Sequence, residues 1–406
     1  MLKQNYYRMI RKQRKQIVIL LGAGAALPWK GISTQELNDI FIADTTFQTK
    51  SGVNVGKFLF DVINNFYGSA SANFETIIAA LETIQNYIIS STNEGHINTS
   101  NTSFTPAILQ LKDIIENDLF LSDDVEEKRI HIYNLFSHYI NLVIYEIEKY
   151  NNNVLDDKYQ VLNSNLIRLV KYYLSHGFYI KFYTLNYDNL VPQIVSPHFK
   201  MHEGLYNSSI NYKKFNFDLN RFRSARLSHF NIHGSIFLNH IFTGLEYETV
   251  YHDYPQNLSV VALEIKAGNP SEKLIYSPLV IGYNKTQRIS NKPFNLGYNA
   301  FANDCNDCTA LLTVGYSFSD PHINSILSTF TKWDRAKLMC VTKLDSDFYR
   351  SSLERLIDYN IVPINPGVDD KTWFHENGDQ KHVYKLGFEE FLKDKQNWSF
   401  LLPTKK

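Results

Sequence analysis

Polar and ionisable side chains follow several apolar, β-rich stretches of the sequence, at the point where each stretch stops. The stretch from Tyr179 ends in Asn186 and Asp188, and the stretch from His229 leads to His233 and a glycine. An amide can hold a water molecule or a ribose hydroxyl, and a histidine suits general-base work near neutral pH. Asn and Asp are also common in turns, so each residue taken alone has a plain structural explanation.

A glycine pair follows the first apolar stretch, in "LLGAGAALPWKGIST" from Leu20. Gly22 and Gly24 have no Cβ, so the backbone could approach a phosphate closely. A helix that follows would offer unpaired N–H groups and the positive end of its dipole to that phosphate. The usual dinucleotide fingerprint has a third glycine where this chain has Leu27. A tight strand–helix turn therefore remains an alternative.

Another apolar stretch ends in "TVGYSFSDPHIN". Gly315 again permits close backbone approach, and the side chains of Ser317, Asp320 and Asn324 suit ribose or phosphate oxygens. Asp320 before Pro321 also has the pattern of a helix cap, and both roles are compatible.

Six short apolar runs predict the elements that position these groups. The runs are continuous rather than alternating, which is typical of parallel strands buried on both faces. They begin at Gln16, Tyr179, His229, Ala310, Lys337 and Asn360. Helical patterns separate some of them, so the predicted fold class is α/β, with a Rossmann-like doubly wound parallel sheet. The carboxyl ends of its strands would bring the polar groups to one edge, where a dinucleotide could contact them all.

A long helical region interrupts this pattern. Residues 35–176 carry mostly 3.6-residue periodicity, which is too much helix for one crossover between strands. We therefore predict a helical insertion module over 35–176 and an α/β core made of 1–34 and 177–366. The remaining residues, 367–406, are predicted to be a C-terminal tail that packs on the core or on a partner.

The composition argues against a disordered, a nucleic-acid-binding and a membrane-spanning protein. The chain has 406 residues, 44% of them hydrophobic, with 41 basic and 41 acidic residues. This favours a large folded core and gives no basic excess for a nucleic-acid partner. The longest apolar run is too short to span a bilayer and no signal peptide is evident, so a cytoplasmic protein without membrane contact is expected.

The cysteines are few and odd in number: Cys305, Cys308 and Cys340. This argues against a disulfide framework. The Cys305–Cys308 pair has zinc-like spacing but no second pair, so a Cys₄ site within one chain is excluded. A mixed site that uses a distant histidine remains open.

The order of the motifs resembles the sirtuin superfamily. "GAGAA" is similar to its Gly-Ala-Gly phosphate loop, "TLNYD" to its Thr-x-Asn-x-Asp segment, "NIHGS" to its His-Gly and "VGYSFSD" to its late Gly-x-Ser. The resemblance runs from about Ile17 to Asn324. The helical insertion, including "NFETIIAALE", is closer to the bacterial defence-associated branch than to protein-deacylating sirtuins.

The resemblance implies a set of site residues around NAD as the substrate. It implies that Asn186 positions a water or ribose hydroxyl and that His233 is the base, with no metal. The implied contacts to NAD are Gly22, Ala23, Gly24, Ala25, Ser33, Asp188, Gly315, Ser317, Asp320 and Asn324.

The resemblance also favours one activity. Deacylating sirtuins carry a four-cysteine zinc module after the His-Gly segment, whereas this chain has one Cys-x-x-Cys pair directly before the next strand. We therefore predict an NAD⁺ glycohydrolase that depletes NAD in anti-phage defence. No segment resembles a sensor, so control by homo-oligomerisation or by a separately encoded regulatory or sensor protein is expected. The alternatives are a sensor or scaffold that binds NAD or ADP-ribose without turnover, and an NAD-dependent protein deacylase.

Overall fold

The computed structural model of the chain divides into two compact units. The first contains residues 1–31, 149–235 and 289–406, and the second contains 32–148 and 236–288. Both units are therefore assembled from separated segments of the chain. The structure describes residues 15–69, 71–91, 112–207, 213–215, 218–242, 247–253, 255, 261–264, 273–276, 279–282, 285–290, 292–331, 336–343, 361–362, 372–375, 381–393 and 395–402.

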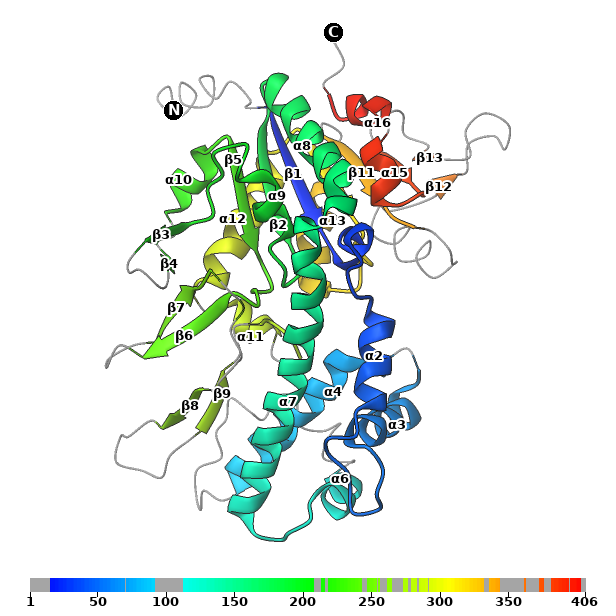
Figure 1. Cartoon of the computed structure of the whole chain (residues 1–406), viewed down its shortest axis with the longest axis vertical. Coiled ribbons are helices and arrows are strands. Elements are labelled where there is room, and N and C mark those ends of the chain that lie inside the picture. Colours follow the sequence, from blue (N-terminus) through cyan, green and yellow to red (C-terminus); the bar gives the residue numbers. More distant parts are fainter. Residues whose placement is uncertain are drawn as a thin grey trace, which may run out of the picture. The chain divides into compact units, whose positions relative to one another are not determined.

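A mixed sheet forms the centre of the first unit (Figure 1). Six parallel strands run in the order β14-β11-β10-β1-β2-β5, and antiparallel β13 and β12 extend the β14 edge. The strands are β1 (Gln16–Leu21), β2 (Tyr179–Thr184), β5 (Leu227–Asn231), β10 (Ala310–Val314), β11 (Lys337–Val341), β12 (Ile361–Val362), β13 (Thr372–His375) and β14 (Lys381–Tyr384). A short hairpin, β3 (Leu205–Asn207) and β4 (Lys213–Phe215), also belongs to this unit. The sheet confirms the predicted Rossmann-like α/β class.

Helices of the first unit pack on the sheet because its strands are apolar on both faces. Val18 and Leu20 of β1 are fully buried in one cluster with Phe301 and Leu327, while Ile17 and Ile19 point to the opposite face. The helices are α8 (Gln160–Ser175), α9 (Leu190–Val195), α10 (Leu219–Ser224), α12 (Phe294–Asp307), α13 (Pro321–Thr331), α15 (Phe388–Lys393) and α16 (Lys395–Phe400). In the described part of this unit, 3₁₀ turns accompany them: η1 (Ala23–Ala25), η2 (Leu27–Trp29), η4 (Asn152–Leu155) and η5 (Asp157–Tyr159).

Five of the six predicted apolar runs form parallel strands, and the sixth does not. In the run from Asn360, Ile361 and Val362 form β12, which pairs antiparallel at the sheet edge, and residues 363–366 lie outside the described part. The sixth parallel strand is β14, from the region predicted as a tail. Its sequence, "KHVY", is short and half polar, so it gives no signal of a buried strand.

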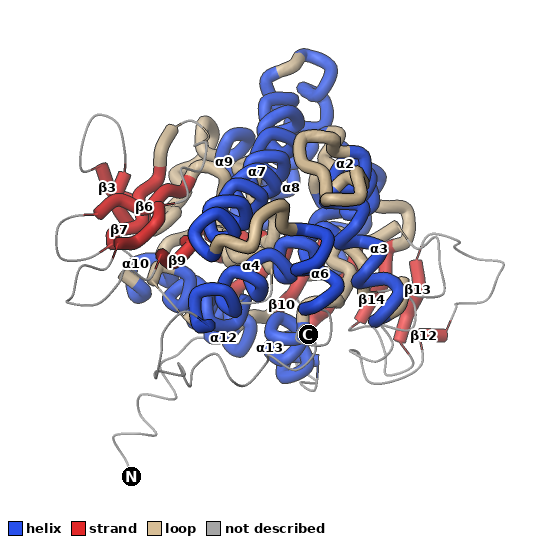
Figure 2. The backbone as a smooth tube through the Cα atoms, turned by 90° about the horizontal axis from the view of Figure 1, so that it is seen from below, coloured by secondary structure: helices blue, strands red, loops and turns tan. Residues whose placement is uncertain are grey.

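The second unit is largely helical (Figure 2). The rings of Phe41 and Tyr139 pack with centroids 4.7 Å apart. Lys285 forms an ion pair with Glu75 at 2.8 Å, and Arg288 forms another with Glu82. The elements are α2 (Thr34–Ala43), α3 (Val55–Tyr67), α4 (Phe74–Ser91), α6 (Lys112–Leu119), most of α7 (Val125–Asn151), β6 (Leu238–Phe242), β7 (Tyr247–Tyr251), β8 (Val261–Glu264), β9 (Lys273–Tyr276) and most of α11 (Lys285–Ile289).

These units differ from the predicted division at 35–176. Helix α8 contacts β2, α9 and α15, so residues 149–176 belong with the sheet. Residues 236–288 fall in the second unit instead of the core. The predicted tail supplies β13, β14, α15 and α16 to the first unit. Among the described residues, no helix is both long and apolar enough to cross a membrane.

Candidate active site

The strand order places a topological switch point between β1 and β10. From β1 the chain adds β2 and then β5 on one side, and β10, β11 and β14 on the other. In open α/β sheets, ligands bind in the crevice beyond the carboxyl ends of the strands at such a point. The loops that follow β1, β2, β5 and β10 all leave this edge, and they carry most of the predicted site residues.

The loops after β1 and β10 lie directly against each other. The Gly22 amide donates to the Val314 carbonyl, and the Gly24 amide donates to the Gly315 carbonyl, each at 2.9 Å. A Cβ on Gly24 would lie 2.8 Å from the Cα of Gly315, and Gly315 itself has φ +58°. The glycines are therefore required for backbone packing between two loops, and this requirement exists without any phosphate.

The segment after this glycine loop differs from the expected strand–helix junction. Two 3₁₀ turns, η1 and η2, come first, and α2 begins only at Thr34. Ser33 belongs to the second unit, where it caps α2: its hydroxyl accepts from the Glu36 amide at 3.2 Å, and Glu36 accepts from the Ser33 amide at 2.7 Å. NAD contacts by Ala23, Ala25 and Ser33 stay predictions.

The turn after β2 carries Asn186 and is held by side chains from the β5 segment. The Asn231 side-chain amide lies 3.1 Å from the carbonyl oxygen of Asn186 and 2.8 Å from that of Asp188. The Ser235 hydroxyl donates to the Tyr187 carbonyl at 2.9 Å. Asn186, which is only partly buried, is thus fixed at its backbone.

Asp188 lies beneath this turn and anchors it. Its carboxylate accepts from the Tyr150 hydroxyl at 2.9 Å and from the Leu190 amide at 3.2 Å. Only 5% of the residue is exposed. Burial raises the pKa of Asp188, and the hydrogen bond from Tyr150 partly offsets that rise. A carboxylate so enclosed is suited to orienting the loop rather than to meeting a ligand.

His233 lies two residues beyond β5 and is almost fully buried, with 2% exposed. Gly234, at φ +85°, lets the chain reverse directly after it. The Nε2 atom of His233 lies 3.0 Å from the Nε2 atom of His322. If the two rings share a hydrogen bond, one nitrogen carries the proton and the other accepts it, because two protons or two lone pairs facing each other would repel.

The loop after β10 is closed by its own polar groups. The Tyr316 hydroxyl donates to Asn324 Oδ1 at 2.9 Å, and Asn324 Nδ2 donates to the Phe318 carbonyl at 2.7 Å. The hydroxyls of Ser317 and Ser319 are 2.8 Å apart. Both side-chain groups of Asn324 are therefore engaged in shaping the loop, and its predicted contact with NAD stays a prediction.

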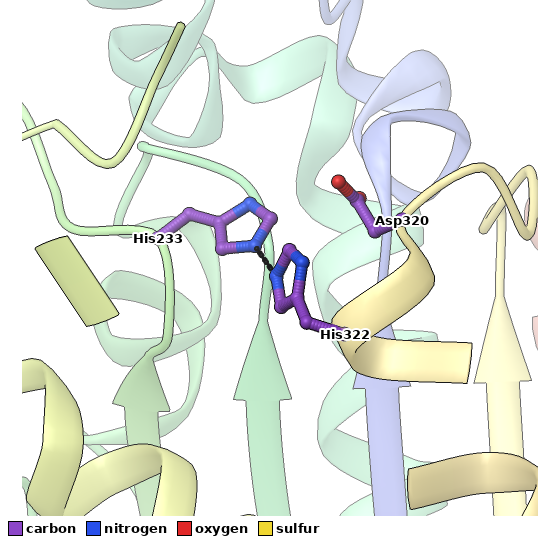
Figure 3. Close-up of side chains that lie close together, drawn as sticks. All are labelled: His233, Asp320 and His322. Carbon is purple, nitrogen blue, oxygen red and sulfur yellow. Dashed lines mark hydrogen bonds between the residues drawn. The ribbon is translucent and has the colours of Figure 1, made fainter. Parts of the chain in front are cut away.

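Asp320 and His322 flank the start of α13 and approach His233 (Figure 3). One ligand atom from each of the three residues lies within 4.8 Å of the others. Of the predicted site residues, the structure thus brings together His233 and Asp320. His322 was not predicted, because the pattern Asp-Pro-His at a helix start is explained by capping alone.

Asn231 and Tyr150 were also missed. Asn231 stands two residues before the predicted His233, at the end of the same apolar run, so its position beside the site carried a usable signal. Tyr150 has no such signal, because it reaches Asp188 from α7, a helix far away in the sequence.

The cysteine pair belongs to the protein core. Cys305 and Cys308 are both buried, and Cys308 Sγ lies 3.3 Å from the Cys305 carbonyl oxygen. Burial raises the pKa of both thiols, which opposes the thiolate form that a metal needs.

One family matches this chain among the comparisons with known proteins. Residues 180–364 match the family described as SIR2-like domain, a range that begins in β2 and takes in the loops with Asn186, His233 and Asp320. β1 and its glycine loop lie outside the match, but β1 pairs in register with β2 and β10. No curated protein matches the chain. The match supports a sirtuin-like core over residues 180–364. SIR2-like domains are typically NAD-dependent enzymes, so the match also supports a function related to NAD.

Proposed function

We propose that this protein is an NAD⁺ glycohydrolase, with Asn186 and His233 as its catalytic residues. The observation that carries the proposal is the register of β2 and β5, in which Thr184 pairs with Asn231. Asn186 and His233 each lie two residues beyond a member of this pair, so they leave the sheet side by side. β2 neighbours β1, and β2 and β5 lie on one side of the β1–β10 switch point, where an open α/β sheet binds its ligand.

The chemistry follows from these two side chains. The bond between C1′ of the ribose and the nicotinamide nitrogen breaks, its electron pair leaves with neutral nicotinamide, and positive charge develops on the ribose ring. Asn186 holds the attacking water through its amide, and a C1′–O bond forms. His233 takes the proton that the water loses. The products are nicotinamide and ADP-ribose.

A chromatographic assay of NAD⁺ tests this function. We expect wild-type protein to release nicotinamide and ADP-ribose. His233→Ala and Asn186→Ala should each slow the release by about 100-fold or more, the usual contribution of a general base or its positioned water. His198→Ala is the matched control, because His198 is exposed and lies in the same unit.

The same assay separates the alternatives. Cyclic ADP-ribose among the products would indicate a cyclase, and release that rises only with an acyl-lysine peptide would indicate a deacylase. NAD⁺ binding without turnover, both in the purified chain and in cells that express it, would favour a sensor or scaffold. Equal turnover by wild type and both alanine variants would refute the assigned residues.

We propose further that NAD depletion serves anti-phage defence and is held off by self-assembly or by a separately encoded protein. The support is the resemblance of the helical insertion to the defence-associated branch. Infected bacterial cells that carry the wild-type gene should lose NAD and limit phage growth, whereas cells with His233→Ala should do neither. Full turnover by the purified monomer alone would contradict the regulatory part.

A further inference from the structure

Two buried or partly buried imidazoles and one carboxylate lie close together in the candidate site (Figure 3). His233 comes from the loop after β5, whereas Asp320 and His322 come from the start of α13. Their ligand atoms lie within 4.8 Å of one another, and the two Nε2 atoms are 3.0 Å apart. Two elements far apart in the sequence thus bring two nitrogens and one carboxylate oxygen near one another.

The separation of the two nitrogens suits a shared metal ion. A tetrahedral Zn²⁺ with Zn–N bonds of about 2.0–2.1 Å places two nitrogen ligands about 3.3 Å apart. The observed 3.0 Å needs a change of only a few tenths of an ångström. A hydrogen bond between the two rings explains the same distance. The nearby carboxylate of Asp320 is what favours a metal ion over a hydrogen bond alone. Asp320 supplies the third ligand, and its negative charge offsets the unfavourable positive end of α13 for a cation.

The main chain that carries the α13 ligands is held by tyrosine hydroxyls. Tyr298 donates to the His322 carbonyl at 2.7 Å, and the Tyr316 hydroxyl lies 3.2 Å from the Asp320 carbonyl oxygen. His233 is held by its burial and by the left-handed Gly234 that follows it. Ligands fixed in this way lose little freedom when an ion binds, which favours affinity.

We propose that His233, Asp320 and His322 bind one divalent transition-metal ion, for which Zn²⁺ best fits the donor set. Three protein ligands leave a fourth position of the ion for water, as in open zinc sites. A consequence for activity rests on the proposed function: bound Zn²⁺ occupies the Nε2 lone pair that His233 needs as a base. The ion therefore inhibits NAD cleavage, and its removal releases the base.

Binding of Co²⁺ to untagged full-length protein, freed of metal with a chelator, tests the site. Tetrahedral Co²⁺ absorbs visible light, and Zn²⁺ competition gives the zinc affinity. We expect one ion per chain for wild type and for the exposed-histidine control His198→Ala. In His322→Gln and in Asp320→Asn the affinity should fall by at least about tenfold, a loss already seen when only outer-shell partners are removed. Circular dichroism melts establish that each variant is folded.

The outcomes separate this site from the proposed function. Absence of Co²⁺ absorbance in wild type, or equal affinity in both ligand variants, would overturn the metal site even if the chain cleaves NAD⁺. Stoichiometric binding that is lost in the variants supports the site even if no turnover is found. If turnover is found, micromolar Zn²⁺ should suppress it in wild type and a chelator should restore it; unchanged turnover with the site filled would overturn the inhibitory role.

Discussion

At the scale of single residues, the Tyr150–Asp188 hydrogen bond supports the turn that carries Asn186. Tyr150→Phe removes the donor to a buried carboxylate, and we expect the free energy of unfolding to fall by about 1–3 kcal/mol. The matched control is Tyr145→Phe, on the same helix but with 57% of Tyr145 exposed. Chemical denaturation of the two variants measures the difference, and equal losses would contradict the support role.

The stability lost in Tyr150→Phe should depend on pH, in a direction that follows from the pKa of Asp188. Burial raises the pKa of Asp188, so the folded state holds the carboxyl proton more tightly than the unfolded chain. Stability from this group is greatest at low pH and falls as pH rises through the folded-state pKa. Without Tyr150 the ionised form loses a donor and the pKa rises further. The deficit of Tyr150→Phe should therefore be larger at about pH 8 than at about pH 4, and the reverse trend would refute this account.

At the scale of elements, the contact between the loops after β1 and β10 depends on Gly315. A Cβ at Gly315 would lie 2.2 Å from the Ala25 amide nitrogen, whereas a Cβ at Gly177, also at positive φ, meets nothing within 4 Å. Gly177→Ala should cost about 1–2 kcal/mol for the left-handed backbone alone. Gly315→Ala should cost more than about 3 kcal/mol, because backbone must also move. Similar urea midpoints for the two variants would show that the loops can separate at little cost.

The elements also show which features a single sequence can predict. β1, β2, β5, β10 and β11 are buried on both faces, and apolar runs mark β1, β10 and β11 most clearly. β14 lies next to the antiparallel edge strands, and its four residues begin with the polar pair Lys381 and His382, so it was missed. Helix α8 has the same periodicity as the helices of the second unit, and its contacts with β2, α9 and α15 assign it to the unit of the sheet.

The candidate site shows the same division between features that a single sequence can and cannot predict. Asn186 and His233 could be predicted to lie at the same edge of the sheet, because parallel strands share one edge. His322 and Tyr150 were not found, because they reach the site by long-range packing that no local pattern encodes. The glycine loop was predicted to approach a phosphate. In the structure its close partner is the loop of Gly315, and the phosphate contact stays a prediction.

At the scale of the whole molecule, residues 381–402 are an integral part of the first unit. Phe391 and Trp398 are buried, and Lys337 donates to the Phe400 carbonyl at 2.7 Å. We expect a chain truncated after residue 376 to lose its cooperative melt, because it lacks β14, α15 and α16. A chain truncated after Leu402 is the control and should melt like wild type. Identical melts for both truncations would show that this segment is dispensable.

The order of the strands in the sheet also sets when the molecule can fold during synthesis. Ile17 of β1 pairs with Ala310 of β10, so the central strand leaves the ribosome long before one of its two neighbours exists. Until then an apolar strand edge stays open, which is a hazard for aggregation and a reason for chaperone binding. Ribosome-arrested chains of increasing length should become protease-resistant only after β10 has emerged, and earlier resistance would show that β1 and β2 are stable without it.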